Sequence, residues 1–193
     1  MRNFLSCIIF VLTLFVLLSC DNSNYKSVIP VDATFVASID FDEIADKGDV
    51  TNSSIFSLIK RDVESMIPSE SKGDILPYFE SPEKLGLDFS DKVYVFMTPN
   101  RCLGITIKVH DSNAVGHFLS LFGDLGLAGN IVERDGLMWS TLIEDFDVVF
   151  NDDTFLILCS LNDGGSAISK QTANYLFSID EDKMFVNSED YKV

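Results

Sequence analysis

Short apolar segments joined by tight turns are the feature that most constrains the fold of this chain. Residues 92–98 and 101–109 are rich in Val, Tyr, Phe and Ile, and Pro99-Asn100 supplies a turn between them. Two similar pairs follow, namely 131–133 with 137–143 around Arg134-Asp135-Gly136, and 146–150 with 155–161 around Asn151-Asp152-Asp153-Thr154. Because tight turns join antiparallel strands, the sequence predicts a hairpin followed by a meander in a mainly antiparallel sheet.

Helical patterns separate these strands. A first strand is expected in the second half of residues 28–41, where apolar and polar residues alternate. Helices are predicted over 42–47, 52–67, 81–86, 112–122 with Asp111 as N-cap, and 164–177. The order strand, helices, hairpin, helix, meander, helix indicates an α+β fold with its helices packed on one face of the sheet.

The first residues read as a secretory leader. Arg2 gives a short positive start, and residues 4–18 are almost entirely apolar. That run is shorter than the ~20 residues needed to span a bilayer. It is followed by Asp21 and further polar residues rather than by a basic flank. We therefore expect a signal peptide over residues 1–19 that is cleaved from the mature protein.

The leader ends in Leu17-Leu18-Ser19-Cys20, which resembles the lipobox of bacterial lipoproteins. This resemblance implies that the Cys20 thiol carries lipid, such as palmitate, and that residues 20–27 form a lipidated tether to a membrane. The alternative is an ordinary signal peptide with a coincidental cysteine. For a Gram-negative cell envelope, we expect the outer membrane rather than the inner one, although Asp21 directly after the cysteine retains some lipoproteins at the inner membrane.

Composition limits the partners of the exported part. The chain has 193 residues, 47% hydrophobic and 23% charged, which is the composition of one globular domain. Its formal net charge is −16, so phosphate backbones are repelled and nucleic acid is excluded as a partner. The acidic charge allows a cationic partner or calcium as a ligand. The simpler interpretation is a solvated acidic surface that keeps the protein soluble.

Four short motifs carry a resemblance to a known family. They are Val28-Ile29-Pro30-Val31-Asp32-Ala33, Leu85-Gly86-Leu87-Asp88 before Val93-Tyr94-Val95-Phe96, Leu103-Gly104, and Asn151-Asp152-Asp153-Thr154-Phe155-Leu156. With them the chain resembles bacteroidete lipoproteins known only as a domain of unknown function. Because such relatives are usually longer, the resemblance implies an N-terminal α+β unit at 28–180. Residues 181–193 would then be a tail. Either the protein is short and ends there, or the tail is the truncated start of a further segment.

Histidines and cysteines give little support for metal or nucleophilic chemistry. A metal site needs three or four converging ligands, whereas the chain has only His110 and His117. Cys102 and Cys159 both lie in predicted strands, where an exported protein can form a disulfide but a buried free thiol is commoner. No serine lies in a nucleophile elbow, and Gly164-Gly165-Ser166 reads as a helix start. We predict no metal and no cofactor.

Acidic and aromatic clusters each have two interpretations. The acidic ones are Asp40, Asp42, Glu43 and Asp46; Glu144, Asp145 and Asp147; and Asn151, Asp152 and Asp153. They suit calcium or a pair of glycosidase carboxylates, but none has the EF-hand pattern, so turn formation and solvation explain them better. Trp139 with Met138, Tyr78, Phe79 and Tyr94 suits a sugar-stacking platform or, more simply, the core.

These patterns together predict a lipid-anchored cell-envelope protein that is not an enzyme. We expect a binding or structural module whose partners are the membrane, through its lipid, and an envelope protein or glycan. The rivals are an acidic-residue envelope hydrolase that uses calcium, and a truncated remnant of a longer lipoprotein.

Overall fold

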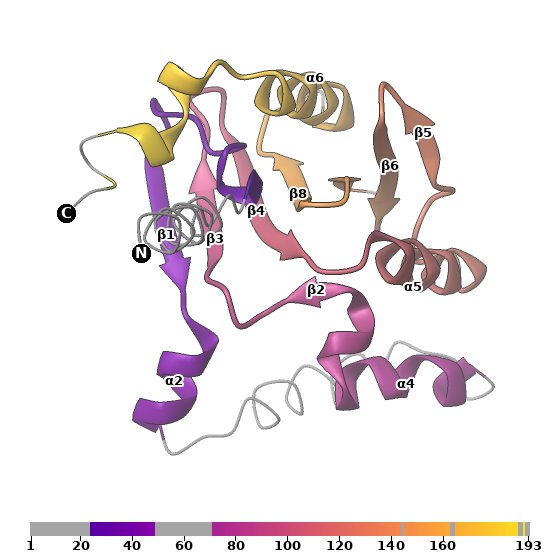
Figure 1. The fold of residues 1–193 in the computed structure, drawn as a ribbon. Coiled ribbons are helices and arrows are strands. Elements are labelled where there is room, and N and C mark those ends of the chain that lie inside the picture. The colour runs from indigo at the N-terminus through magenta and orange to yellow at the C-terminus, as the bar shows by residue number, and fades with distance from the viewer. Residues whose placement is uncertain (1–23, 49–70, 144, 163–164, 189–190, 192–193) are drawn as a thin grey trace, which may run out of the picture.

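The computed structural model describes residues 24–48, 71–143, 145–162, 165–188 and 191 (Figure 1). Within them, a single antiparallel sheet has the strand order β1-β3-β4-β8-β7-β6-β5, and β2 pairs with the far end of β4. The strands are β1 (Phe35–Ile39), β2 (Leu87–Asp88), β3 (Val93–Met97), β4 (Cys102–Val109), β5 (Val132–Arg134), β6 (Leu137–Leu142), β7 (Phe146–Phe150) and β8 (Thr154–Ser160). The predicted hairpin and meander are confirmed, and the long return from β4 places β8 between β4 and β7.

The helices match most of the sequence prediction. They are α2 (Phe41–Gly48), α4 (Lys72–Glu80), α5 (Ser112–Asp124) and α6 (Gly165–Phe177), with 3-10 turns η1 (Asn24–Lys26), η3 (Pro82–Leu85), η4 (Glu181–Lys183) and η5 (Phe185–Asn187). Asp111 caps α5 as expected, because its carboxylate accepts hydrogen bonds from the backbone N–H groups of Asn113 and Ala114. The helix predicted over 52–67 lies outside the described residues. Among these described helices, none is long and apolar enough to cross a membrane.

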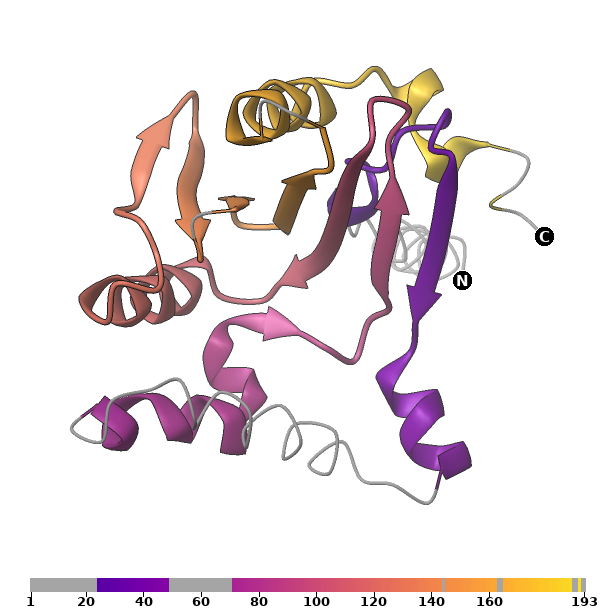
Figure 2. The same ribbon diagram turned by 180° about the vertical axis from the view of Figure 1, so that it is seen from behind.

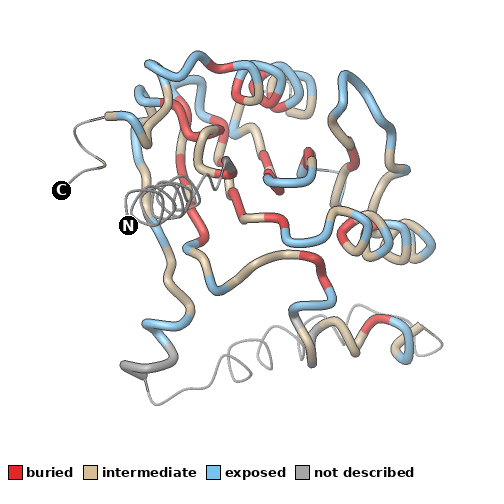
Figure 3. Tube along the Cα trace, viewed as in Figure 1, coloured by how far each residue is buried: buried red, intermediate tan, exposed pale blue. Residues whose placement is uncertain are grey.

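Helices cover both faces of the sheet, not one, which corrects that part of the prediction. On one face Ala173 and Leu176 of α6 pack with Leu156 and Leu158 of β8. On the opposite face, Val115 and Leu119 of α5 form a second core with strand residues such as Phe150 and Phe155. Figures 1 and 2 show α6 and α5 on opposite sides of the strands, and Figure 3 shows buried residues concentrated between them. The central strands are apolar on both sides, so each face needs a cover.

The folded unit extends beyond the boundaries expected at residues 28 and 180. Tyr25, which the sequence placed in the tether, is fully buried; its hydroxyl donates to the Lys92 carbonyl, and its own carbonyl accepts from Thr106 Oγ1. On the C-terminal side, Phe185 N–H donates to the Ile29 carbonyl at 2.8 Å. Residues of the predicted tether and tail therefore complete the core on the α6 face.

Two glycines of the family-like motifs are required by the fold. Gly86 ends η3 with φ +75°, and a Cβ there would clash with the Asp111 carbonyl oxygen at the start of α5. Gly104 lies opposite Phe96 on β3, and its missing side chain leaves the space that the Phe96 ring fills. These motif positions build the scaffold rather than a site.

Candidate functional site

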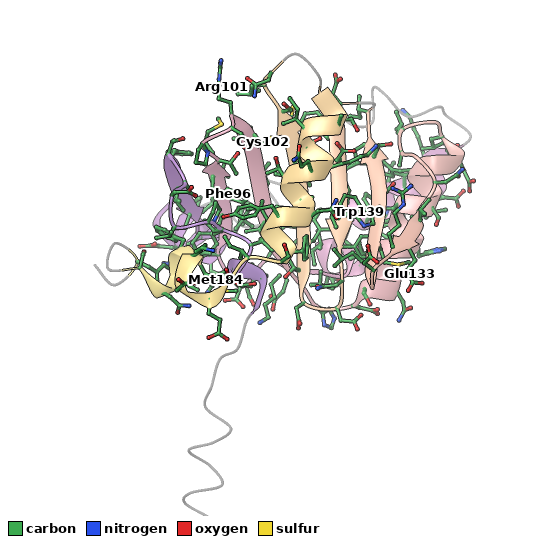
Figure 4. The ribbon with its side chains drawn as sticks, turned by 90° about the horizontal axis from the view of Figure 1, so that it is seen from above. Phe96, Arg101, Cys102, Glu133, Trp139 and Met184 are labelled. Atoms are coloured by element: carbon green, nitrogen blue, oxygen red, sulfur yellow. The ribbon has the colours of Figure 1, made fainter. Side chains whose placement is uncertain are left out.

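A hollow of the described residues lies where the β3–β4 turn meets α6 and the chain entering β1. We call it the α6 groove. It encloses about 390 Å³ and is lined by Pro30, Asp32, Thr98, Pro99, Asn100, Gln171, Thr172 and Tyr175. Three segments far apart in the sequence thus contribute to one concave surface, at the hairpin end that carries Arg101 and Cys102 in Figure 4.

Hydrogen bonds fix the wall of the α6 groove. Asn100 Nδ2 donates to Thr172 Oγ1 at 2.8 Å, which ties the β3–β4 turn to the middle of α6. The Asn100 carboxamide oxygen accepts from Thr98 Oγ1, and its backbone carbonyl accepts from Asn162 Nδ2. Thr172 in turn donates to the Ile168 carbonyl within α6. The groove is therefore preformed, with its turn held in one conformation.

The remaining polar side chains of the α6 groove are available to a ligand. Within the described residues, no group hydrogen-bonds to the Asp32 carboxylate or to the Gln171 carboxamide, and both residues are exposed. Tyr175 exposes 48% of its surface. Pro30 and Pro99 add apolar surface between these groups. The groove thus combines an aromatic ring, apolar walls and one carboxylate.

The two cysteines do not form a disulfide. Cys102 is buried on the α6 side, with its Sγ 3.4 Å from Thr172 Oγ1. Cys159 faces the other side of the sheet, because its register partner is Leu103, the neighbour of Cys102 in β4. The interpretation as free thiols is confirmed, with Cys102 buried and Cys159 partly buried.

Within the described residues, the predicted acidic clusters form no group that could hold a metal. Among the described residues, no three His, Cys, Asp or Glu side chains are grouped closely enough to hold a metal. Asp40 accepts from the Glu43 N–H at the start of α2, and the Asn151 side chain accepts from the N–H groups of Asp153 and Thr154 in the β7–β8 turn. Glu144 lies outside the described residues. These residues shape turns and helix starts, as the simpler interpretation predicted.

Asp147 differs from the other acidic residues because it is buried. Only 1% of its surface is exposed, and its carboxylate accepts hydrogen bonds from Ser166 and Ser169 in the first turns of α6. Lys170 Nζ lies 3.6 Å from the same carboxylate. Asp147 therefore anchors α6 to β7, and its partners leave no open position for a substrate.

Trp139 and Tyr94 belong to the core rather than to a stacking platform, and the side chain of Phe79 lies outside the described part of the structure. Trp139 is 8% exposed, and its indole N–H has no hydrogen-bond partner within the described residues. Figure 4 shows it beside α6, with whose residues Ala173 and Leu176 it shares a core cluster. Tyr78 packs against Phe118 of α5. Burial, followed by a hydrogen bond with Tyr191, raises the pKa of the Tyr94 hydroxyl above its ordinary value, so this phenol stays protonated.

A second hollow of about 350 Å³ lies at the N-terminal end of α5. Glu133 of β5 and Asp152 of the β7–β8 turn line it, together with Ser112, Asn113, Gly116, Gly136, Met138, Phe150 and Asn151. Asp152 is occupied, because its carboxylate accepts a hydrogen bond from Ser112 Oγ. The lining of this hollow is more polar than that of the α6 groove. One of its carboxylates, however, already has a hydrogen-bond partner.

One partly exposed ion network stabilises the β2–β4 end of the sheet. Lys108 Nζ lies 2.7 Å from Asp91 and 3.3 Å from Asp88. A hydrogen bond from the Ser90 side chain, reinforced by Lys108, lowers the pKa of Asp88, while Asp91 and Asp88 raise the pKa of Lys108. The network is structural, since it lies outside both hollows.

Comparison with known proteins places the chain in a family. The model of a family described as "Domain of unknown function (DUF4836)" matches residues 25–193. The chain belongs to this family. The match starts at Tyr25, the residue whose burial marks the start of the folded unit. No curated protein and no solved structure matches the chain. Family membership thus supports the fold boundary but assigns no activity.

Sequence reasoning found the turn Pro99-Asn100 and the helix that carries Thr172, but not the groove that they form. The residues lining it come from positions 30–32, 98–100 and 171–175. Taken alone, these segments indicate the entry to a strand, a turn and one face of a helix, respectively. Only the β4–β8 pairing, which brings α6 over the first hairpin, places them together.

Proposed function

We propose that this protein is a lipid-anchored, non-enzymatic binding module of the cell envelope, held at the outer membrane. The observation that carries the proposal is the leader that ends in Leu17-Leu18-Ser19-Cys20. Cys20 itself lies outside the described residues. Its thiol would carry the lipid, and two or three acyl chains would hold the protein stably at a bilayer, at about 0.8 kcal/mol for each buried methylene.

The short distance between anchor and domain supports a binding role close to the membrane. Tyr25 follows Cys20 by five positions and is fully buried. Since an extended chain spans at most about 3.6 Å per residue, the core at Tyr25 would lie within about 18 Å of the acylated cysteine. The domain would therefore present its surface to partners at the membrane rather than in the open periplasm or medium.

The arrangement of carboxylates favours binding over hydrolysis. Asp147 is held by two serine hydroxyls, and Asp152 is held by Ser112. A glycosidase needs two free carboxyl groups flanking one bond. The α6 groove instead offers a single free carboxylate, Asp32, within a preformed and mostly apolar surface. This composition suits recognition of a ligand.

Lipidation can be tested in cells with the full chain. Metabolic labelling with radioactive palmitate should label the protein, and globomycin should cause its precursor to accumulate. Cys20→Ala should abolish both effects. Cys7→Ala is the matched control, because Cys7 is a second cysteine of the leader outside the lipobox. Equal labelling of the Cys20→Ala variant would disprove the anchor.

A hydrolase is the second candidate, because Glu133 and Asp152 line the same hollow beside α5. It predicts release of reducing sugar from envelope glycans by the purified full chain, with and without added calcium. Glu133→Gln should then remove the activity, whereas Glu43→Gln, outside the hollow, should not. Absence of product from all fractions would leave only the binding module.

A further inference from the structure

The α6 groove has the charge and shape of a receptor for a long cationic side chain. Its walls at Pro30 and Pro99 can cover an aliphatic stem, as the stems of Lys and Arg pack on apolar surfaces while their charged ends reach polar groups. The half-exposed ring of Tyr175 suits a cation, because the face of an aromatic ring attracts positive charge. Asp32 supplies a carboxylate for the charged end.

The charge of the whole protein favours the same ligand. The formal net charge is −16, so a cationic partner is attracted at long range and an anionic one is repelled. No basic residue is among those that line the groove; Lys183, which interacts electrostatically with Tyr175, is paired with Asp180. Arg101, which follows Asn100 in the turn, extends away from the body of the domain in Figure 4.

The groove includes residues just before β1, whereas residues 29–31 on that stretch already pair with residues 183–185. Asp32 precedes β1 by three residues, and β1 is the terminal strand of the sheet in the part of the chain that is described. Phe35, the first residue of β1, is 49% exposed. An open edge pairs readily with an extended polypeptide, which gains main-chain hydrogen bonds along the strand and places single side chains in adjacent pockets.

We propose that the α6 groove receives the lysine or arginine side chain of an extended segment of a partner protein that pairs along β1. The groove volume of about 390 Å³ fits this ligand. It lies at the low end of the range of ligand sites, about 300–1,000 Å³, which suits one long side chain better than a folded element. The hydrogen bond from Asn100 to Thr172 holds the wall before binding, so little ordering cost is expected there. The proposal names the ligand of the proposed binding module and rests on that function.

The test measures binding of short peptides to the purified full chain in neutral detergent micelles. The probes are fluorescein-labelled, capped Thr-Val-Arg-Val-Thr and the same peptide with Gln in place of Arg, followed by fluorescence anisotropy. We expect the Arg peptide to bind about tenfold more tightly, the difference that one charge-assisted hydrogen bond supplies. Equal affinity of the two peptides would overturn the proposal.

Two variants locate the site. Asp32→Asn should remove the advantage of the Arg peptide, whereas Asp153→Asn, which removes the same charge from an exposed residue of the β7–β8 turn, should keep it. Tyr175→Leu should weaken the Arg peptide while leaving the fold intact, because the side chain is half exposed. Equal losses in Asp32→Asn and Asp153→Asn would show general attraction to an acidic surface and overturn the site.

Two further outcomes separate this inference from its alternatives. Free spermidine should compete only weakly; if it displaces the peptide at equal concentration, the ligand is a small polyamine and the proposed polypeptide is wrong. Cys20→Ala should bind the Arg peptide as the parent protein does, because the described groove is built from residues 30–32, 98–100 and 171–175. Loss of lipidation and loss of peptide binding are therefore independent results.

Discussion

Asp147→Ala should destabilise the domain more than any other single loss of a carboxylate among the described residues. Asp147 is 1% exposed, and its carboxylate accepts from two hydroxyls of α6 and pairs with Lys170. Hydrogen bonds to a charged group contribute about 1.5–3 kcal/mol each. Ser169 keeps one alternative acceptor, the Ser166 carbonyl at 3.2 Å, and the variant no longer buries a charge.

These opposing effects set the expected magnitude. The variant loses two hydrogen bonds, but Ser169 can still bond to the Ser166 carbonyl and the cost of burying a charge disappears. The net loss in the free energy of unfolding should be about 2–4 kcal/mol. For a domain of this size, each kcal/mol lowers Tm by about 2–4 °C. The melting temperature should therefore fall by about 4–16 °C.

Urea and thermal denaturation of the full chain measure this loss. The fluorescence of Trp139, the single tryptophan, reports the sheet beneath α6, and circular dichroism reports the helices. Asp145→Ala is the matched control, because Asp145 is an exposed carboxylate two residues away, in the turn before β7. If the two variants unfold within about 0.5 kcal/mol of each other, the range usual for surface substitutions, Asp147 does not anchor α6.

Two further predictions concern the motif glycine and the ion network. Gly86→Ala should lower the free energy of unfolding by about 2–4 kcal/mol, because alanine is strained at a left-handed φ and its Cβ clashes with the Asp111 carbonyl. Gly126→Ala is the control: Gly126 has φ +72° but open space around it, so the loss should be only about 1–2 kcal/mol. Equal losses of the two variants in urea denaturation would refute the clash. Lys108→Met should cost less than about 1 kcal/mol at pH 7, because the ion pairs are partly exposed. Since the folded-state pKa of Asp88 is below its ordinary 3.8, this difference should persist above that pH and shrink as pH falls below it, in denaturation curves at pH 3 and 7.

Local chemistry made much of the sheet predictable. The turn at Pro99-Asn100 and the cap at Asp111 depend on neighbouring residues, and both are where the sequence predicts them. The helix α4 was missed because Pro77 lies inside it and its apolar residues form no clear stripe. Its stability comes from contacts distant in sequence, such as Tyr78 with Phe118.

The second helical layer was missed although a signal for it exists. Val148, Val149 and Phe150 are consecutive and all buried, and a strand whose successive residues are all buried must be covered on both faces. If β7 is assumed to alternate between buried and exposed residues, one of its faces is expected to be exposed. No local sequence pattern predicts the groove, because its polar groups come together only when α6 packs against the first hairpin.

The burial of Tyr25 determines where a mechanical load enters the molecule. A pull on the residues before Tyr25 acts directly on the centre of the sheet, through the Tyr25 hydroxyl on Lys92 and the Thr106 hydroxyl on the Tyr25 carbonyl. Close by, the Ile29 carbonyl is bonded to Phe185, so the same pull shears the contact between the two ends of the folded chain. Force applied at the N-terminus would therefore be resisted by several parallel hydrogen bonds loaded together, rather than by a strand peeled away one bond at a time.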